Sequence, residues 1–183
     1  RDDRALRALL LQRFRDFMGV SGGHVPSGYD FLSQAVSYPY AWIHQANHGL
    51  VKPLKWPFSD ALIMLCHTGK KLATHRHLST VHLGSLEKGH ALALEAARGW
   101  QAADLRLFCD HVNAYHRWML DSGWVVSTTE TWIEQLMDHS AVMAAKGCGA
   151  GGSDVIALIV SAQYVHEITD YAHSLGLRVL TSR

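Results

Sequence analysis

A glycine-rich connection between two apolar stretches constrains this 183-residue chain more than any other feature. Four glycines fall within the six residues 147–152, after Lys146 and before Asp154. The flanking stretches, residues 141–144 and 155–160, have the length and composition of buried strands. Because glycine tolerates positive φ and lets the backbone approach a ligand closely, the amides of such a loop are free to donate. We therefore predict a strand–loop–strand unit that either holds an anion or is a glycine hairpin without a ligand.

This loop matches neither of the two common phosphate-binding fingerprints. A Walker A loop needs Gly-Lys-Ser/Thr at a fixed spacing, which is missing here. The dinucleotide fingerprint needs a helix after the loop, whereas an apolar strand is predicted to follow Asp154. Any anion bound here would therefore be held in a different type of loop.

Charge and composition exclude several partners and locations. The formal net charge of +1 gives no support for a nucleic-acid partner. No apolar run approaches the roughly 18 residues of a membrane span, and no signal peptide is visible. The three cysteines and thirteen histidines lack metal-ligand spacing, and the odd cysteine count fits a reducing compartment. We expect a cytoplasmic protein with no membrane contact and no metal site.

The length of the chain suits one domain, or one domain plus part of another. Arg1 is not an initiator methionine and a helical pattern begins at once, so we expect a piece of a longer protein. Apolar spacing predicts a first helix over residues 6–18, strands at 40–46, 50–54, 61–66 and 178–180, mostly helix over 74–139, and a helix over 163–175. Ser127 and Glu130 have the spacing of a capping box. This order favours an α+β fold, with helices on one face of a mostly antiparallel sheet.

A second candidate site is the segment Pro26-Ser27-Gly28-Tyr29-Asp30. It places a carboxylate after a Gly/Ser-rich loop and near a predicted helix N-terminus, where the helix dipole keeps an acid ionised. The alternative interpretation of Asp30 is a helix-capping residue without a catalytic role.

The third candidate site follows the strand predicted at residues 61–66. Thr68, Gly69, Lys70 and Lys71 form a turn with two ammonium groups, and Thr74 follows at a predicted helix start. Hydroxyls, cations and a helix N-terminus together are typical of an anion site. A solvated strand–helix turn explains the same residues equally well.

Taken together, the three segments resemble the C-terminal half of the GHMP kinase superfamily, which includes galactokinase, homoserine kinase, mevalonate kinase and phosphomevalonate kinase. Residues 146–154 resemble the superfamily's third, Gly-Ala-Gly-Gly motif. Pro26 to Asp30 is similar to the segment whose aspartate faces the acceptor, and Thr68 to Thr74 resembles the Thr-Gly…Thr segment of the mevalonate-pathway members. The resemblance covers roughly residues 20–160, and Ser153-Asp154 looks more like phosphomevalonate kinases than mevalonate kinases.

The resemblance implies a fold and an activity. It implies that residues 1–55 are the tail end of the N-terminal kinase domain with the substrate loop, and that residues 56–183 are a ferredoxin-like C-terminal domain. The full-length protein would then be an ATP- and Mg²⁺-dependent kinase that phosphorylates mevalonate or phosphomevalonate, in isoprenoid precursor synthesis. Asp30 would accept the proton of an attacking hydroxyl, or orient an acceptor that is already a phosphate.

The resemblance also implies roles for the remaining candidate residues. Lys70 or Lys71 would hold the carboxylate or phosphate of the acceptor, and the loop Gly149 to Gly152 would stand near the transferred phosphoryl group. The substrate-binding set would be Ser27, Gly28, Thr68, Gly69, Lys70, Lys71 and Thr74. The phosphate loop would be Gly149, Ala150, Gly151, Gly152, Ser153 and Asp154. We expect Asp30, the lysine-bearing turn and the bend at 149–152 to converge on one cleft.

The chain departs from the superfamily in lacking its N-terminal motif and the Gly-x-Gly-x-Ser-Ser loop that cradles the nucleotide phosphates. We therefore expect this chain alone to be inactive and to bind neither ATP nor Mg²⁺ tightly. Its expected partners are a small-molecule substrate, the missing N-terminal half and a second copy of itself, since removing that half exposes apolar surface. The alternative is a non-catalytic domain that binds an anion, a metabolite or a partner protein while keeping the fold.

Overall fold

The computed structural model describes residues 8–16, 40–44, 50–70, 86–148 and 154–182. The chain divides into two compact units, Arg1–Trp56 and Pro57–Arg183. In the first unit residues 8–16 are helical, and β1 (Tyr40–His44) pairs antiparallel with β2 (Leu50–Leu54). The two strands predicted in this region are thus confirmed.

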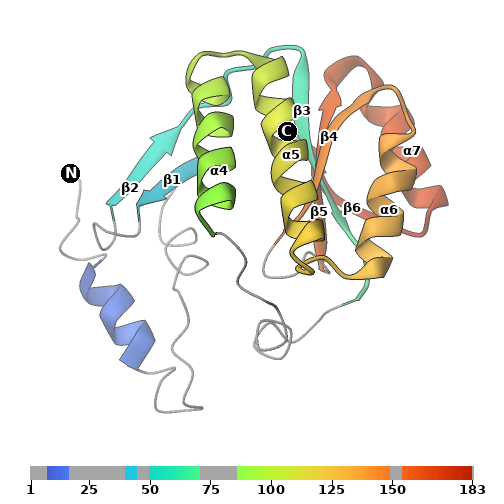
Figure 1. The fold of residues 1–183 in the computed structure, drawn as a ribbon. Helices are drawn as coiled ribbons and strands as arrows, with labels where there is room; N and C mark the ends of the chain where they lie inside the picture. The colour runs from blue at the N-terminus through green and yellow to red at the C-terminus, as the bar shows by residue number, and fades with distance from the viewer. Residues whose placement is uncertain (1–7, 17–39, 45–49, 71–85, 149–153, 183) are drawn as a thin grey trace. The chain divides into compact units, whose positions relative to one another are not determined.

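The second unit is built on one four-stranded sheet, in the order β4-β5-β3-β6, in which every neighbouring pair is antiparallel. Figure 1 shows the helices that connect these strands. The strands are β3 (Ala61–His67), β4 (Val142–Gly147), β5 (Val155–Ser161) and β6 (Arg178–Ser182). The helices are α4 (Leu86–Gln101), α5 (Leu105–Asp121) and α6 (Ser127–Met137) between β3 and β4, and α7 (Val165–Ser174) between β5 and β6, after a short 3-10 turn. This is the ferredoxin-like, split βαβ arrangement, so the predicted α+β class with an antiparallel sheet is confirmed.

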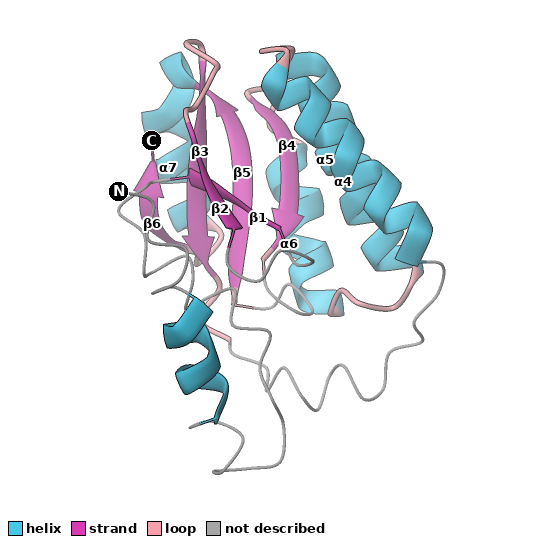
Figure 2. Cartoon of the chain, turned by 90° about the vertical axis from the view of Figure 1, so that its left-hand side faces the viewer, coloured by secondary structure: helices cyan, strands magenta, loops and turns pink. Residues whose placement is uncertain are grey.

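The main core lies between one face of this sheet and the two helices α6 and α7, which stand behind the sheet in Figure 2. Alternate side chains of β3 and β5 point into this core because strand side chains alternate between the two faces. Ile133 and Leu136 of α6, and Ile168 of α7, cover them. The buried strand residues are Met64, Cys66, Ile156, Leu158 and Val160. Burying these side chains is the main stabilising term of the unit.

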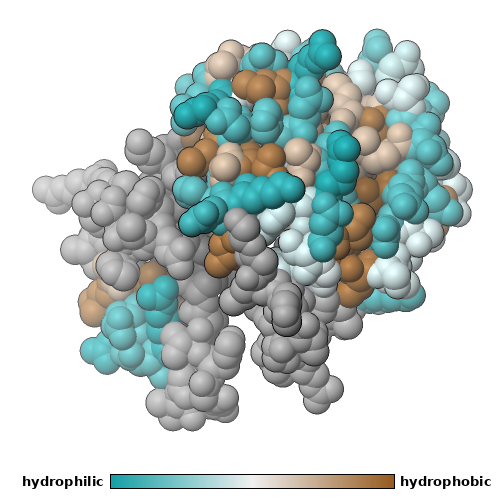
Figure 3. Space-filling model, viewed as in Figure 1, coloured by the Kyte–Doolittle hydropathy of each residue, from teal (hydrophilic) through white to brown (hydrophobic). Residues whose placement is uncertain are grey.

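The helices α4 and α5 form a closely packed pair beside β4. A Cβ added at Gly89 would meet the indole ring of Trp118, and one added at Gly99 would lie 2.5 Å from the backbone nitrogen of Phe108. Glycine at both positions therefore lets the two helices approach each other. The outer surface of the pair mixes hydrophilic and apolar side chains (Figure 3), with Leu86 and Leu94 of α4 exposed.

The side chain of Asn113 covers part of the outer edge of β4. Its Nδ2 donates to the carbonyl oxygen of Met143 at 3.0 Å, and its Oδ1 accepts from the backbone N–H of Ala145 at 3.1 Å. An open strand edge is a template for unwanted pairing with another chain. This amide therefore satisfies two edge groups that β5, on the other side of β4, cannot reach.

The predicted capping box at Ser127 and Glu130 is wrong. Helix α6 begins at Ser127, its N-cap is Val126, and no side chain caps it. The carbonyl oxygen of Val126 accepts the backbone N–H groups of Thr129 and Glu130, so the backbone itself closes the first turn. None of the helices in the described ranges is long and apolar enough to span a membrane.

Candidate functional site

Two of the predicted segments meet at one end of the sheet. The strand β3 ends at His67, which lies opposite Val155 at the start of β5 and opposite Arg178 at the start of β6. The strand β4 ends at Gly147, opposite Ile156. Because neighbouring strands are antiparallel, the turn after β3 and both ends of the glycine connection lie at this same end.

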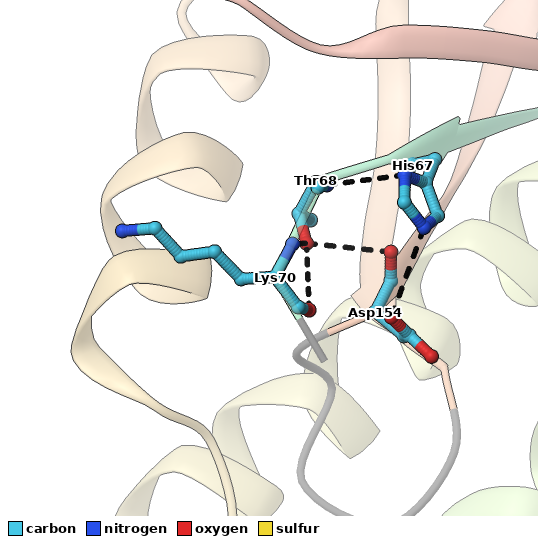
Figure 4. A network of polar contacts seen from close by, with 5 residues as sticks. His67, Thr68, Lys70 and Asp154 are labelled. Atoms are coloured by element: carbon cyan, nitrogen blue, oxygen red, sulfur yellow. Dashed lines mark hydrogen bonds and ion pairs between the residues drawn. The ribbon is translucent and has the colours of Figure 1, made fainter. Parts of the chain in front are cut away.

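Direct hydrogen bonds join the turn after β3 to the exit of the glycine connection. The backbone N–H of Thr68 donates to the carbonyl oxygen of Asp154 at 3.0 Å, and the Thr68 hydroxyl lies 3.3 Å from the same oxygen (Figure 4). Thr68 is 6% exposed, although it follows the last residue of its strand. At the start of the glycine connection, the backbone N–H of Cys148 donates to the carbonyl oxygen of Val155 at 2.8 Å. The glycine connection is thus closed at its base and held against the turn.

The turn after β3 is tight and is closed by hydrogen bonds among its own residues. Gly69 has φ +74°, which a residue with a Cβ rarely adopts. Its N–H donates to Nδ1 of His67 at 3.1 Å, and the N–H of Lys70 donates to the Thr68 hydroxyl at 3.2 Å. The Thr-Gly pair is therefore required by the geometry of the turn.

The side chains of His67 and Asp154 face each other across the two strands. His67 Nε2 lies 3.8 Å from Asp154 Oδ1, which is longer than a hydrogen bond. That oxygen is buried and has no hydrogen-bond partner among the described residues. The two side chains are 33% and 39% exposed, so solvent reaches other parts of the pair.

Cationic side chains gather at this end of the sheet. The ammonium of Lys70 lies over the ring of Trp132 and points away from Asp154 in Figure 4. Lys146 Nζ donates to the carbonyl oxygen of Gly147 at 2.8 Å and lies 5.8 Å from the ring centroid of Tyr115. Arg178, which lies opposite His67 at the start of β6, is exposed. Such a group of cations favours an anionic ligand.

A buried histidine lies beside this group. His116 is 7% exposed, and its Nδ1 has no hydrogen-bond partner within the described part of the chain. Burial lowers the pKa of His116, and the nearby ammonium of Lys146 lowers it further. The ring is therefore neutral near pH 7 and adds no charge to the site.

The structure brings together only some of the predicted site residues. Thr68, Gly69, Lys70 and Asp154 form one network. The other candidates lie outside the described residues, so the expected convergence with residue 30 stays a prediction. They are Asp30, Ser27, Gly28, Lys71, Thr74, Gly149, Ala150, Gly151, Gly152 and Ser153.

The sequence analysis did not identify His67 and Lys146 as site residues, although both adjoin predicted segments. His67 immediately precedes the Thr-Gly turn, and Lys146 opens the glycine connection. A signal was available for His67, because an imidazole next to a tight turn accepts a backbone N–H readily. No local signal indicates its approach to Asp154, which is 87 positions further along the chain.

The described ranges contain one further hollow, separate from this network. A hollow of about 420 Å³ lies between the start of α5 and β4 and is lined by Leu105, Arg106, Cys109, Asp110 and Met143. It lies toward the beginning of β4, away from Gly147, so it is separate from the network above. No group of three or more His, Cys, Asp or Glu side chains that could hold a metal ion occurs in the described part of the chain.

Comparisons with known proteins give matches at the level of structure. No protein-family model and no curated protein matches the sequence. The solved Streptococcus pneumoniae phosphomevalonate kinase, in complex with phosphomevalonate and AMPPNP, is 14% identical, with a TM-score of 0.72 over 97% of this chain and 58% of that chain. The L. major mevalonate kinase, in complex with R-mevalonate, is 18% identical, with a TM-score of 0.66 over 85% and 51%. The Lactococcus lactis galactokinase, complexed with galactose, is 17% identical, with a TM-score of 0.54 over 76% and 48%.

These likenesses show a shared fold. The chain spans about half the length of each of these solved proteins. Function is carried by the residues of a site and not by the fold.

Proposed function

We propose that this chain, which has the fold of the solved GHMP kinases, is the acceptor-side part of an ATP-dependent small-molecule kinase. The proposed acceptor is phosphomevalonate or mevalonate. Its partners within this proposal are the acceptor, the remainder of the same kinase and a second copy of the chain.

One observation carries the proposal. The hydrogen bond from Thr68 N–H to the carbonyl oxygen of Asp154 joins the predicted acceptor-binding turn to the predicted phosphate loop. A phosphoryl transfer needs both the acceptor and the transferred group to be held within bonding distance. The meeting of Thr68 and Asp154 at one end of the sheet supports such an arrangement.

Charge neutralisation supports the same activity. The transition state of phosphoryl transfer is loose and anionic, so catalysis depends on positioning and on cations. Lys70 is proposed to bind the carboxylate or phosphate of the acceptor, and the amides of the loop Gly149 to Gly152 to face the transferred group. Asp30 is proposed to take the proton of a hydroxyl acceptor, or to orient an acceptor that is already ionised.

The expected ATP and magnesium are assigned within the proposal to the remainder of the kinase. No group of three or more His, Cys, Asp or Glu side chains among the described residues could hold a metal ion. The sequence also lacks the Gly-x-Gly-x-Ser-Ser segment that would cradle the nucleotide. Within the proposal, nucleotide and metal are therefore bound by the remainder of the kinase.

The first test is calorimetric titration of this chain with phosphomevalonate, mevalonate and magnesium-ATP. We expect one of the two acceptors to bind and magnesium-ATP to bind weakly, with no phosphoryl transfer. Thr68→Val removes the hydroxyl of the turn after β3 and keeps the side-chain volume. This variant should bind the acceptor more weakly. Tight magnesium-ATP binding, or no binding of either acceptor by the folded chain, would contradict the proposal.

The second test uses the longer protein. We expect Asp30→Asn to lower turnover by about 10²–10⁴-fold, as for loss of a general base, and to leave ATP affinity nearly unchanged. If the longer protein binds the acceptor but transfers no phosphoryl group, the non-catalytic metabolite-binding alternative is the correct one. Equal turnover of the variant would remove Asp30 from the mechanism.

A further inference from the structure

We propose that His67 is a positioning residue, whose Nε2–H holds the carboxylate of Asp154 and so fixes the exit of the glycine loop against the Thr68–Lys70 turn. The predicted effect on ligand binding rests on the proposed function. The structural relation between the two side chains does not.

The hydrogen bonds around His67 determine which ring nitrogen carries the proton. The backbone N–H of Gly69 donates to Nδ1 at 3.1 Å, so Nδ1 is the acceptor and has no proton. In a neutral imidazole the other nitrogen, Nε2, is then protonated. This is the nitrogen that faces Asp154 Oδ1 at 3.8 Å. The turn after β3 thus aims a donor at residue 154.

Asp154 needs such a donor. Its Oδ1 is buried and makes no hydrogen bond within the described residues, which is unfavourable for a carboxylate oxygen. The backbone of Asp154 is already fixed, because its carbonyl oxygen accepts from Thr68 N–H at 3.0 Å. A movement of about 1 Å by either side chain would bring Nε2 and Oδ1 to hydrogen-bonding distance.

The pairing has a consequence for an anion bound in the glycine loop. Asp154 directly follows the loop, and an unpaired carboxylate there would repel a phosphate group. Donation from His67 partly compensates the negative charge and directs the carboxylate toward β3. His67 therefore acts on the ligand through Asp154 and need not touch it.

Three variants of the full chain separate this role from a role in the turn alone. In His67→Gln the side-chain amide nitrogen stands in for Nε2 and can still reach Asp154. In His67→Asn the amide oxygen stands in for Nδ1 and keeps the bond from Gly69, but the side chain is too short to reach Asp154. His67→Ala loses both contacts. Thermal unfolding of each variant verifies that the fold is kept.

Inorganic pyrophosphate is the probe, measured by calorimetric titration. We expect His67→Gln to bind within about twofold of the unmodified chain. We expect His67→Asn and His67→Ala to lose at least about fivefold in affinity. If His67→Asn binds as the unmodified chain does and His67→Gln does not, His67 serves the turn alone and the inference is overturned.

A measurement without ligand keeps the two proposals distinguishable. The ¹⁵N shifts of the ring should show a bare Nδ1 and a protonated Nε2, and amide exchange at Thr68 should be faster in His67→Asn than in His67→Gln. A protonated Nδ1, or equal exchange in the two variants, would overturn the role of His67 whether or not pyrophosphate binds. If the unmodified chain does not bind pyrophosphate while these shifts and rates are as expected, the anion-binding part of the proposed function fails and the positioning role of His67 stands.

Discussion

The ammonium group of Lys70 lies 5.5 Å from the centroid of the Trp132 ring. This contact ties the turn after β3 to helix α6, while Thr68 ties the same turn to residue 154. A cation over an indole face is held by the ring quadrupole at a modest free energy, about 0.5–1 kcal/mol at exposed sites. Lys70 is therefore held at the end of the sheet and can leave the ring for a stronger anionic partner.

The first prediction concerns Lys70. Lys70→Met should weaken pyrophosphate binding by about fivefold to tenfold, because a cation near the proposed anion is lost. The free energy of unfolding should change by less than about 1 kcal/mol. Arg106→Met, which removes an equal charge from the far end of α5, is the matched control and should bind normally. Equal affinity of Lys70→Met and the control would exclude Lys70 from the site.

The second prediction concerns Asn113 and the edge of β4. Asn113→Ala leaves Met143 C=O and Ala145 N–H without their partner and should lower the free energy of unfolding by about 2–3 kcal/mol. The open edge should also promote self-association, measured by sedimentation. Asp110→Ala on the exposed side of the same helix should change stability by less than about 0.5 kcal/mol. A similarly small effect at Asn113 would contradict its role at the edge.

The third prediction compares two glycines of α4. Gly99→Ala pushes against the backbone of Phe108 and should cost about 2–3 kcal/mol in urea unfolding. Gly89→Ala pushes against the side chain of Trp118 and should cost less. A second substitution, Trp118→Leu, should relieve part of the strain at position 89 and none at position 99. Equal costs that are both additive with Trp118→Leu would contradict the predicted coupling between position 89 and Trp118.

The fourth prediction concerns acid stability. Because burial and Lys146 lower the pKa of His116, the unfolded chain binds this proton more readily than the folded protein does. The contribution of the neutral His116 ring to the free energy of unfolding is complete above about pH 6.5, the ordinary histidine pKa. This contribution is lost as the pH falls below that value. His116→Gln should therefore show a smaller decrease in melting temperature between pH 7 and pH 5. His90→Gln, at an exposed position of α4, should keep the full decrease.

The fifth prediction concerns thiol reactivity. Burial raises the pKa of Cys66 to about 11, and burial together with Asp110 raises the pKa of Cys109 to about 12. Cys148 is half-buried at the entrance of the glycine connection. Iodoacetamide should modify Cys148 at least about tenfold faster than either buried thiol, because the thiolate is the reacting form. Peptide mapping after brief alkylation measures the three rates, and comparable rates would indicate that the core opens easily.

Most of the architecture follows from patterns within short windows of sequence. The apolar run of β5 and the glycines before it predict a buried hairpin, and β4 pairs with β5 as expected. Ser127 and Glu130 have the spacing of a capping box, and α6 does begin at Ser127, but no side chain caps it. A carbonyl oxygen, that of Val126, takes the first amides instead. Side-chain spacing does not reveal which backbone group closes a turn.

The site was only partly predictable for a different physical reason. The Thr-Gly turn is a local structure, so its residues could be identified. The approach of His67 to Asp154 depends on which strands become neighbours, and their positions are far apart in sequence. The double hydrogen bond of Asn113 has the same origin, since it requires α5 to lie along β4. Contacts that depend on which strands and helices become neighbours cannot be predicted from short windows of sequence.

The central place of β3 has a consequence for how the protein reaches its native state. This strand is the first of its sheet to leave the ribosome, yet its two neighbours, β5 and β6, are the last. The backbone N–H and C=O groups of β3 therefore have no strand partner until nearly the whole unit has been synthesised. Pairings between such distant segments form slowly, so the nascent sheet closes late and is vulnerable to aggregation until then.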